Sequence, residues 1–528
     1  MSLWDKLFGN KEEPPIGYND TTKISKSLDQ NLEAIKADLT DCDDIIYREA
    51  YVGKKGDYKI ALAYIDGMAD RDLLNRDVLS NLMVRVRMAD PEPKAIKSKI
   101  QDFILDNSLA ITDMSEVETH EEAMNFLLSG ETVLLLEEYD KAIIIATRAW
   151  EARGISEPVT EAVIRGPRDG FVETFRFNTV LIRRRIRDPK LKLKIKQVGR
   201  RSKTDIAVMY IEDLVNRRAL EKIEERLNAV DIDAVLDSGY IEQLTEDNWL
   251  SPFPQIQNTE RPDTASAALY DGRIVLVVDN TPFVLILPTT FNALLQSAED
   301  YYERWSIATA VRLLRYLAVF ICLLAPSLYV AITSFHPHMI PTELALFIAA
   351  SRQGIPFPAI VEALIMEATI EILREAGVRL PGPIGATIGI VGGLVIGQAA
   401  VEAGIVSPLM VITVAITAIS SFAIPNYNLA IGFRLLRFGF IFMAAFLGLY
   451  GVALLMLLVM VHLCSLKSFG IPYMSPYTNY IDNPNDLKDT FVLFPLPGLR
   501  RRSLISFRKN KVRQKDLRPE DFNKEDQS

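Results

Sequence analysis

The apolar segment from residue 311 to residue 466 constrains the fold most, because it combines membrane-compatible length with charged side chains. A helix needs about 20 residues to cross the hydrocarbon core of a bilayer. The candidate crossings are residues 313–333, 383–401, 405–424 and 434–463, the last of which is long enough to tilt. Residues 339–377 are either a re-entrant or interfacial helix pair or two further crossings. We therefore expect an α-helical polytopic membrane domain with four to six crossings.

Basic residues predict the orientation of this domain. Arg304, Arg312 and Arg315 flank its start, and Lys and Arg residues accumulate again after residue 466. Residues 335–341, on the far side of the first crossing, contain neither Lys nor Arg. Because positive charge collects on the cytoplasmic side of membrane proteins, we expect both termini to be cytoplasmic and the number of full crossings to be even.

Composition divides the 528 residues into regions. The predicted domains are an N-terminal linker or helix over residues 1–40, α/β subdomains over 41–155 and 156–300, the transmembrane domain over 305–466, and a basic cytoplasmic tail over 467–528. The net charge of −9 argues against bulk binding of nucleic acid. The three cysteines lie far apart, so neither a disulfide framework nor a metal site is expected.

The region before the membrane domain contains a repeat. Residues 60–66 align with residues 206–212 as an apolar strand that leads into a charged helical pattern. Residues 128–136 align with residues 270–278 as a glycine turn followed by a buried strand. Ordinary β–α units also resemble one another by chance. Because two matched pairs occur in the same order, we expect a cytoplasmic α/β region of two related subdomains.

A glycine-containing turn and a basic segment are the candidate binding features of this region. Residues 161–171 lack the phosphate-loop signatures, so a structural turn that contacts a neighbouring subunit or subdomain fits better than an anion site. Residues 183–203 include a period-two stretch that predicts a strand with one basic face. This face meets anionic lipid or another subunit, or it is simply solvated. The candidate contact residues are Arg183, Arg184, Arg185, Arg200, Arg201 and Lys203.

Charged side chains within the membrane block form the candidate functional stripe. On a helix, Glu367, Glu371, Arg374 and Glu375 fall within one arc of about 100°, and Glu362 lies outside it. A carboxylate row attracts cations and is suited to line a conduction path. The same pattern is typical of an interfacial helix whose polar face lies among headgroups. From these residues alone, the interfacial helix is the slightly better interpretation.

Glycines at every fourth position predict close helix packing in the same block. The residues are Gly385, Gly389, Gly393 and Gly397, and on a helix they form one smooth face. His336 and His338 have no nearby Cys or carboxylate partner in the sequence and make a poor metal site. The sequence contains none of the common catalytic motifs. We therefore expect no catalytic residue, no metal and no cofactor.

Several long motifs, taken in order, resemble a known family over about residues 25 to 500. They are residues 161–173, 198–205, 260–263, 278–283, 297–302, 334–343 and 380–385. Together they are similar to the A subunit of the spore germinant receptors of the GerA type. The resemblance implies a protein of the inner membrane of dormant spores in endospore-forming bacteria. Its implied partners are a permease-like B subunit and a lipoprotein C subunit.

The resemblance also implies a mechanism. The receptor complex senses small nutrients and starts germination, with early release of monovalent cations, and its A subunits are thought to form an oligomeric, nutrient-gated ion channel. With this implication, the interpretation of the stripe at Glu367, Glu371 and Glu375 shifts from the polar face of an interfacial helix toward a pore lining. The alternative is a membrane scaffold or signal transducer that conducts nothing. A secondary transporter is a third interpretation, but the membrane half contains no recognisable inverted repeat.

Overall fold

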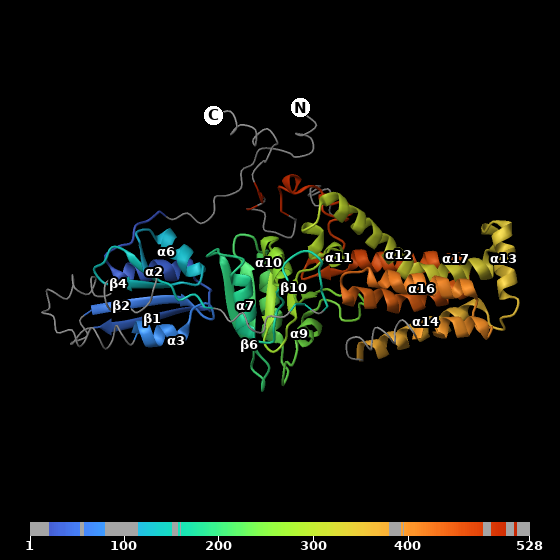
Figure 1. Cartoon of the computed structure of the whole chain (residues 1–528), viewed down its shortest axis with the longest axis horizontal. Helices are drawn as coiled ribbons and strands as arrows, with labels where there is room; N and C mark the ends of the chain where they lie inside the picture. The colour runs from blue at the N-terminus through green and yellow to red at the C-terminus, as the bar shows by residue number, and fades with distance from the viewer. Residues whose placement is uncertain are drawn as a thin grey trace, which may run out of the picture. The chain divides into compact units, whose positions relative to one another are not determined.

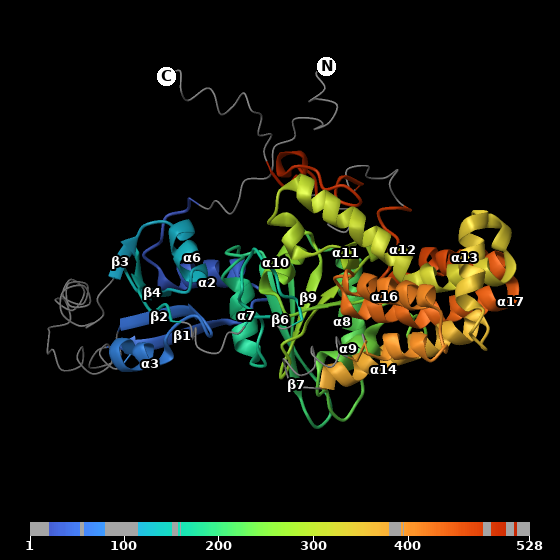
Figure 2. The same cartoon turned by 45° about the vertical axis from the view of Figure 1, so that its right-hand side comes forward.

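The computed structural model describes residues 21–52, 58–79, 114–149, 157–158, 160–379, 392–393, 395–478, 487–502, 510 and 512–514. The chain divides into two compact units (Figures 1 and 2). The first unit comprises Met1–Glu246, Asn258–Pro288 and Leu496–Ser528, and the second comprises Asp247–Gln257 and Thr289–Pro495.

The first unit contains two five-stranded sheets with the same strand order. One sheet has the order β1-β2-β4-β5-β3 and consists of β1 (Ile45–Val52), β2 (Tyr58–Ile65), β3 (Met114–Val117), β4 (Thr132–Leu136) and β5 (Ala142–Ile145). The other has the order β6-β7-β9-β10-β8 and consists of β6 (Leu191–Val198), β7 (Thr204–Ile211), β8 (Gln257–Thr259), β9 (Ile274–Val278) and β10 (Val284–Leu287). Antiparallel pairing dominates both sheets.

The strand register is also the same in the two sheets. Ile60 of β2 pairs with Leu136 of β4, and Ile206 of β7 pairs with Val278 of β9. These are the residues that the sequence repeat aligns with each other. The repeated segments therefore occupy equivalent central strands, whose apolar side chains are buried on both faces of the sheet.

Helices cover the sheets in an equivalent order along the chain. In the first sheet α2 (Leu28–Asp38) and α6 (His120–Leu128) pack on one face (Figure 1). In the second, α7 (Phe175–Arg183) and α10 (Pro262–Tyr270) take these places. The remaining described helices of this unit are the short α3 (Arg71–Leu73), the π-helix η1 (Leu74–Leu79), α8 (Arg217–Ala229), α9 (Ser238–Thr245) and the 3₁₀ helix η5 (Leu496–Gly498).

A matched asparagine braces the first helix of each repeat. The side chain of Asn31 accepts from the backbone N–H of Ser25 and donates to its carbonyl, at 2.8 and 2.6 Å. Asn178 makes the same two bonds to the backbone of Val172, at 2.8 and 2.5 Å. In both cases the partner lies six residues earlier, so the approach of the chain to the helix is fixed in the same way.

A buried ion pair joins the two halves of the first unit. Arg183, at the end of α7, donates to both carboxylate oxygens of Asp44 at 2.9 and 2.7 Å, and neither side chain is more than 4% exposed. The backbone next to Asp44 pairs with the edge strand β6. The N–H of Asp43 donates to the carbonyl of Leu193. This contact covers an edge that would otherwise present unpaired backbone groups.

The second unit is mainly helical. Its elements are α11 (Phe291–Leu295), η2 (Ala298–Tyr301), α12 (Trp305–Phe335), η3 (Pro337–Met339), α13 (Thr342–Arg352), α14 (Ala359–Arg379), α16 (Pro408–Phe422), α17 (Tyr427–Ser465), and the short strands β11 (Lys467–Ser468) and β12 (Ile471–Pro472). Among the described residues, α12 and α17 are the helices long and apolar enough to cross a membrane, and α16 is a shorter apolar helix.

The helix α17 reverses direction at Gly448. The backbone there has φ 59° and ψ −141°, a non-helical conformation that glycine tolerates. A straight helix would place Phe433 and His462 about 43 Å apart. Instead, the ring of Phe253 lies 5.8 Å from the ring of Phe433 and 6.1 Å from that of His462. The predicted single tilted crossing over residues 434–463 is therefore corrected to a hairpin of two helices.

Candidate functional site

The helix α14 carries the charged stripe, and its central carboxylate is buried against an arginine. Arg437, in the first half of α17, donates to Glu367 at 2.5 Å. Neither side chain is more than 1% exposed. A charge in such apolar surroundings is costly unless it is paired, which explains why the two residues meet. The second carboxylate oxygen of Glu367 is buried without a hydrogen-bond donor among the described residues.

The next carboxylate along α14 lies between two further arginines. Glu371 accepts from Arg434 of α17 at 3.1 Å and from Arg374 of its own helix at 3.3 Å. Arg374 also donates to the hydroxyl of Ser421 on α16, at 3.1 Å. Arg434 precedes Arg437 by one helical turn, so the two guanidinium groups leave the same face of α17.

The stripe predicted from the sequence is therefore an ion-pair cluster in this chain. Two carboxylates, Glu367 and Glu371, face three guanidinium groups, and Glu375 lies exposed one turn further along α14. Sequence reasoning found the acidic partners and Arg374 but missed Arg434 and Arg437. Their signal was present, since two arginines three residues apart in an apolar segment require partners.

A second buried carboxylate, near the start of α14, contacts the end of α13 and the start of α16. Glu362 is fully buried, accepts from the backbone N–H of Ser407 at 2.8 Å and pairs with Arg352 at 3.0 Å. The Ser407 hydroxyl lies 3.0 Å from the hydroxyl of Tyr329 on α12. As expected from the sequence, Glu362 does not belong to the stripe.

These contacts define the relative directions of three helices. The start of α14 meets the start of α16 at Glu362 and Ser407, and the later parts of the two helices meet at Arg374 and Ser421. The helices α14 and α16 therefore run parallel. The first half of α17 runs antiparallel to α14, because the earlier Arg434 contacts the later Glu371.

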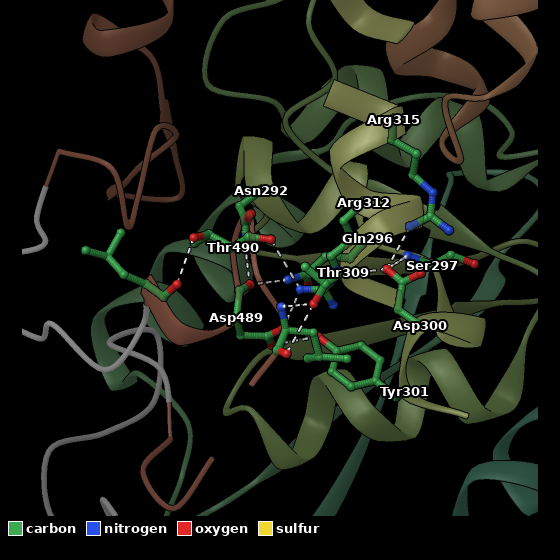
Figure 3. A network of polar contacts seen from close by, with 12 residues as sticks. Asn292, Gln296, Ser297, Asp300, Tyr301, Thr309, Arg312, Arg315, Asp489 and Thr490 are labelled. Atoms are coloured by element: carbon green, nitrogen blue, oxygen red, sulfur yellow. Dashed lines mark hydrogen bonds and ion pairs between the residues drawn. The ribbon is translucent and has the colours of Figure 1, made fainter. Parts of the chain in front are cut away.

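A third polar network clamps the start of α12 (Figure 3). Arg312 donates to Asp300 of η2 at 2.9 Å and to Asp489 at 2.7 Å. Arg315 donates to the same oxygen of Asp300 at 2.7 Å, and the hydroxyl of Tyr301 donates to Asp489 at 2.7 Å. The sequence pattern placed Arg312 and Arg315 only as markers of orientation, and nothing in the sequence links Arg312 to a residue 177 positions away.

The predicted glycine face is described only in part. Gly385 and Gly389 lie outside the described residues. A methyl group at Gly397 would lie 3.4 Å from Val411 of α16, whereas one at Gly393 would meet nothing within 4 Å. The neighbouring Gly392 is closer packed, since a methyl group there would lie 2.9 Å from Leu373 of α14.

The candidate basic contacts divide by exposure. The prediction of a lipid or subunit contact is corrected for Arg183, because its guanidinium is fully buried against Asp44. Arg185 pairs with Asp169 at 2.6 Å and Arg200 pairs with Asp231 at 2.9 Å. Arg184 is partly buried, and Arg201 and Lys203 are exposed.

The predicted basic strand is β6, and acidic groups of the same chain meet its lysines. Lys194 of β6 pairs with Asp41 at 3.1 Å, and Lys190, which immediately precedes the strand, pairs with Asp213 at 3.0 Å. The lysine face therefore has partners within its own unit.

The glycine-containing turn packs against a second segment of the first unit. Arg261 donates to the carbonyls of Glu161 and Pro167, at 3.1 and 3.0 Å. Its guanidinium therefore links two positions of the turn. The Glu161 carboxylate accepts from the hydroxyl of Thr259 at 2.6 Å. Burial raises the pKa of Glu161 to about 7 in spite of these donors. The geometry agrees with a structural turn.

Comparisons with known proteins cover most of this chain. The family model "Bacillus/Clostridium GerA spore germination protein" matches residues 33–505. Spore germination protein KA of Bacillus subtilis is 44% identical over 94% of this chain and 90% of its own length. A Bacillus subtilis protein described as uncharacterized membrane protein YfkQ is 41% identical over 92% of each chain. The crystal structure of the N-terminal domain of the A subunit of the Bacillus megaterium spore germinant receptor GerK3 aligns with 29% identity, a TM-score of 0.40, and coverage of 52% of this chain and 99% of that one.

Proposed function

Because the chain belongs to the GerA family of Bacillus/Clostridium spore germination proteins, we propose that it is the A-type membrane subunit of a nutrient-sensing germinant receptor. In this role it resides in the inner membrane of the dormant spore and helps to initiate germination. Its partners are a permease-like B subunit, a lipoprotein C subunit and further copies of itself. The role is one of sensing and conduction, without catalysis.

The proposed topology has six crossings with both termini in the cytoplasm. The crossings are α12, α14, residues 383–401, α16 and the two halves of α17. Parallel neighbours such as α14 and α16 require the chain to return across the membrane between them, which supports the third crossing. The start of α12 and the end of α17 then lie on the same side, where basic residues predict the cytoplasm.

The proposed mechanism is an oligomeric, nutrient-gated cation channel. The observation that carries it is the buried pair between Glu367 and Arg437, which lies between two crossing helices. In the resting state the arginines of α17 neutralise the carboxylates of α14. Movement of α14 away from α17 would free Glu367 and Glu371 to attract cations.

A specific observation favours the alternative, a scaffold or signal transducer that does not conduct. Glu367 and Glu371 are both paired with arginines, so in the resting state neither carboxylate is free to attract cations. If the pairs never separate, they serve only to fix the helices and relay movement between the partner subunits.

Neutralisation of the carboxylates distinguishes these mechanisms. Replacement of Glu367, Glu371 and Glu375 by Gln in the assembled receptor is expected to reduce nutrient-triggered cation release and to change its selectivity. The matched control is Glu343→Gln on the exposed α13. Unchanged release and selectivity, with normal receptor levels, would favour the scaffold. A channel also requires a closed ring, so the purified protein is expected to form a symmetric oligomer.

A further inference from the structure

Two adjacent apolar side chains project from a short segment of the second unit. Trp249 is 77% exposed and Leu250 is 74% exposed. They lie in Asp247–Gln257, which the chain inserts between α9 and β8 and which packs with the helical unit. Exposed neighbouring apolar residues of this size mark a contact with a partner or a membrane.

The segment Asp247–Gln257 packs against one end of the α17 hairpin. The hydroxyl of Ser251 lies 2.9 Å from Nε2 of His462. The backbone carbonyl of Pro252 touches Gly432 so closely that a methyl group would not fit there. The ring of Phe253 packs against Phe433. All these contacts lie at the end of the hairpin opposite Gly448.

Hydrogen bonds from both sides hold the backbone of the projecting turn. The side chain of Gln255 accepts from the N–H of Asn248 at 3.0 Å and donates to its carbonyl at 2.7 Å. The carboxylate of Asp247 accepts from the N–H of Phe469, just beyond α17, at 2.6 Å. Trp249 and Leu250 are thus held in position, so contact with a partner requires little further ordering of the backbone.

Other exposed aromatic residues begin the neighbouring helices. Trp305 is 50% exposed at the first residue of α12, and Tyr427 is 58% exposed at the first residue of α17. Trp and Tyr are enriched where a membrane helix meets water, because their rings are amphipathic. The contacts of the Ser251–Phe253 segment bring Trp249 to the same end of the hairpin as Tyr427.

We propose that Trp249 and Leu250 insert into the cytoplasmic interface of the lipid bilayer, as an anchor that is not itself a crossing. The proposal rests on the membrane topology proposed above. The occupant is lipid, since the anchor is continuous with the ends of crossing helices. The adjacent Glu246 and Asp247 are acidic, so insertion depends on apolar contact and not on anionic headgroups.

Fluorescence quenching in lipid vesicles tests the anchor. The full-length protein is reconstituted in phosphatidylcholine with Trp4, Trp150 and Trp305 replaced by Phe, which leaves Trp249 as the single fluorophore. Lipid brominated near the headgroup is expected to quench its emission by about half, and lipid brominated deep in the chain to quench it less. Addition of phosphatidylglycerol is expected to change neither result.

A second single-tryptophan variant separates this proposal from the topology on which it rests. In that variant Trp305 is retained and Trp249 is replaced by Phe. Quenching of Trp305 without quenching of Trp249 would overturn the anchor and leave the topology standing. Absence of quenching at both positions would overturn both. If Trp249 is shielded from aqueous acrylamide but not quenched by brominated lipid, protein covers it and the lipid anchor is likewise overturned.

Discussion

Arg437 of α17 and Glu367 of α14 face each other at 2.5 Å, and neither side chain reaches the surface. The pair connects α17 to α14 at the centre of a cluster that also contains Arg434, Glu371 and Arg374. Removal of one partner leaves an unpaired charge in apolar surroundings, whereas removal of both does not. This asymmetry makes the pair testable by mutation.

We expect Arg437→Met to lower the free energy of unfolding by about 3–5 kcal/mol, because Glu367 would remain buried and charged. The double variant Glu367→Leu/Arg437→Met is expected to recover most of this loss. Thermal unfolding of the purified protein in detergent measures both. If the double variant is no more stable than Arg437→Met alone, the two side chains do not act as a pair.

We expect Gly448→Ala to disrupt the hairpin. Alanine disfavours the observed φ of 59°, and its methyl group would lie 2.8 Å from the ring of His336. Strain of this kind costs about 1–3 kcal/mol. The control is Gly393→Ala, where a methyl group meets nothing within 4 Å. Equal melting temperatures for the two variants would contradict the reversal at Gly448.

Loss of the polar network at the start of α12 is expected to loosen the segment around Asp489. Asp489→Ala removes the acceptor for Arg312 and Tyr301, at a cost of about 1–3 kcal/mol. Hydrogen exchange is expected to increase over residues 487–493 and over the first turns of α12. As a control, Asp231→Asn alters an exposed pair with Arg200 and should leave exchange in both segments unchanged.

The raised pKa of Glu161 predicts a pH dependence of stability in the first unit. A carboxyl group with a folded-state pKa of about 7 binds more protons in the folded than in the unfolded state between its ordinary value of 4.5 and 7. Stability therefore decreases as pH rises through this window. Glu161→Gln is expected to flatten this dependence, as followed by thermal unfolding from pH 4.5 to 8. The same slope in wild type and variant would contradict the assignment, and the exposed Glu157→Gln serves as the control.

The periodic and local features of this chain were accessible from sequence. The alignment of Ile60 with Ile206 predicted matching apolar strands in two related subdomains, because buried central strands carry continuous apolar runs. The structure adds that these strands share sheet position and register. The stripe on α14 followed from helical spacing alone. In each case the residues that form the pattern lie within about ten positions of one another in the sequence.

Long-range pairings were not accessible in the same way. Nothing near Asp489 in the sequence identifies Arg312 as its partner, and the pairing of Asp44 with Arg183 depends on how the two sheets meet. The reversal at Gly448 was missed because the flanking residues are uniformly apolar and helical. One glycine among them is a weak signal, since glycine is also common within membrane helices.

We expect the charged face of α14 to become accessible to cations when the receptor is activated. Single cysteines at Glu367, Glu371 and Glu375, and at Met366, Ile370 and Leu373 for comparison, are introduced into a receptor that lacks Cys42, Cys322 and Cys464. A membrane-impermeant thiol reagent is then applied with and without nutrient. We expect the reagent to block cation release only at the first set, and at Glu367 and Glu371 only in the presence of nutrient. Block at neither set, or block without helical periodicity, would contradict it and favour the non-conducting scaffold.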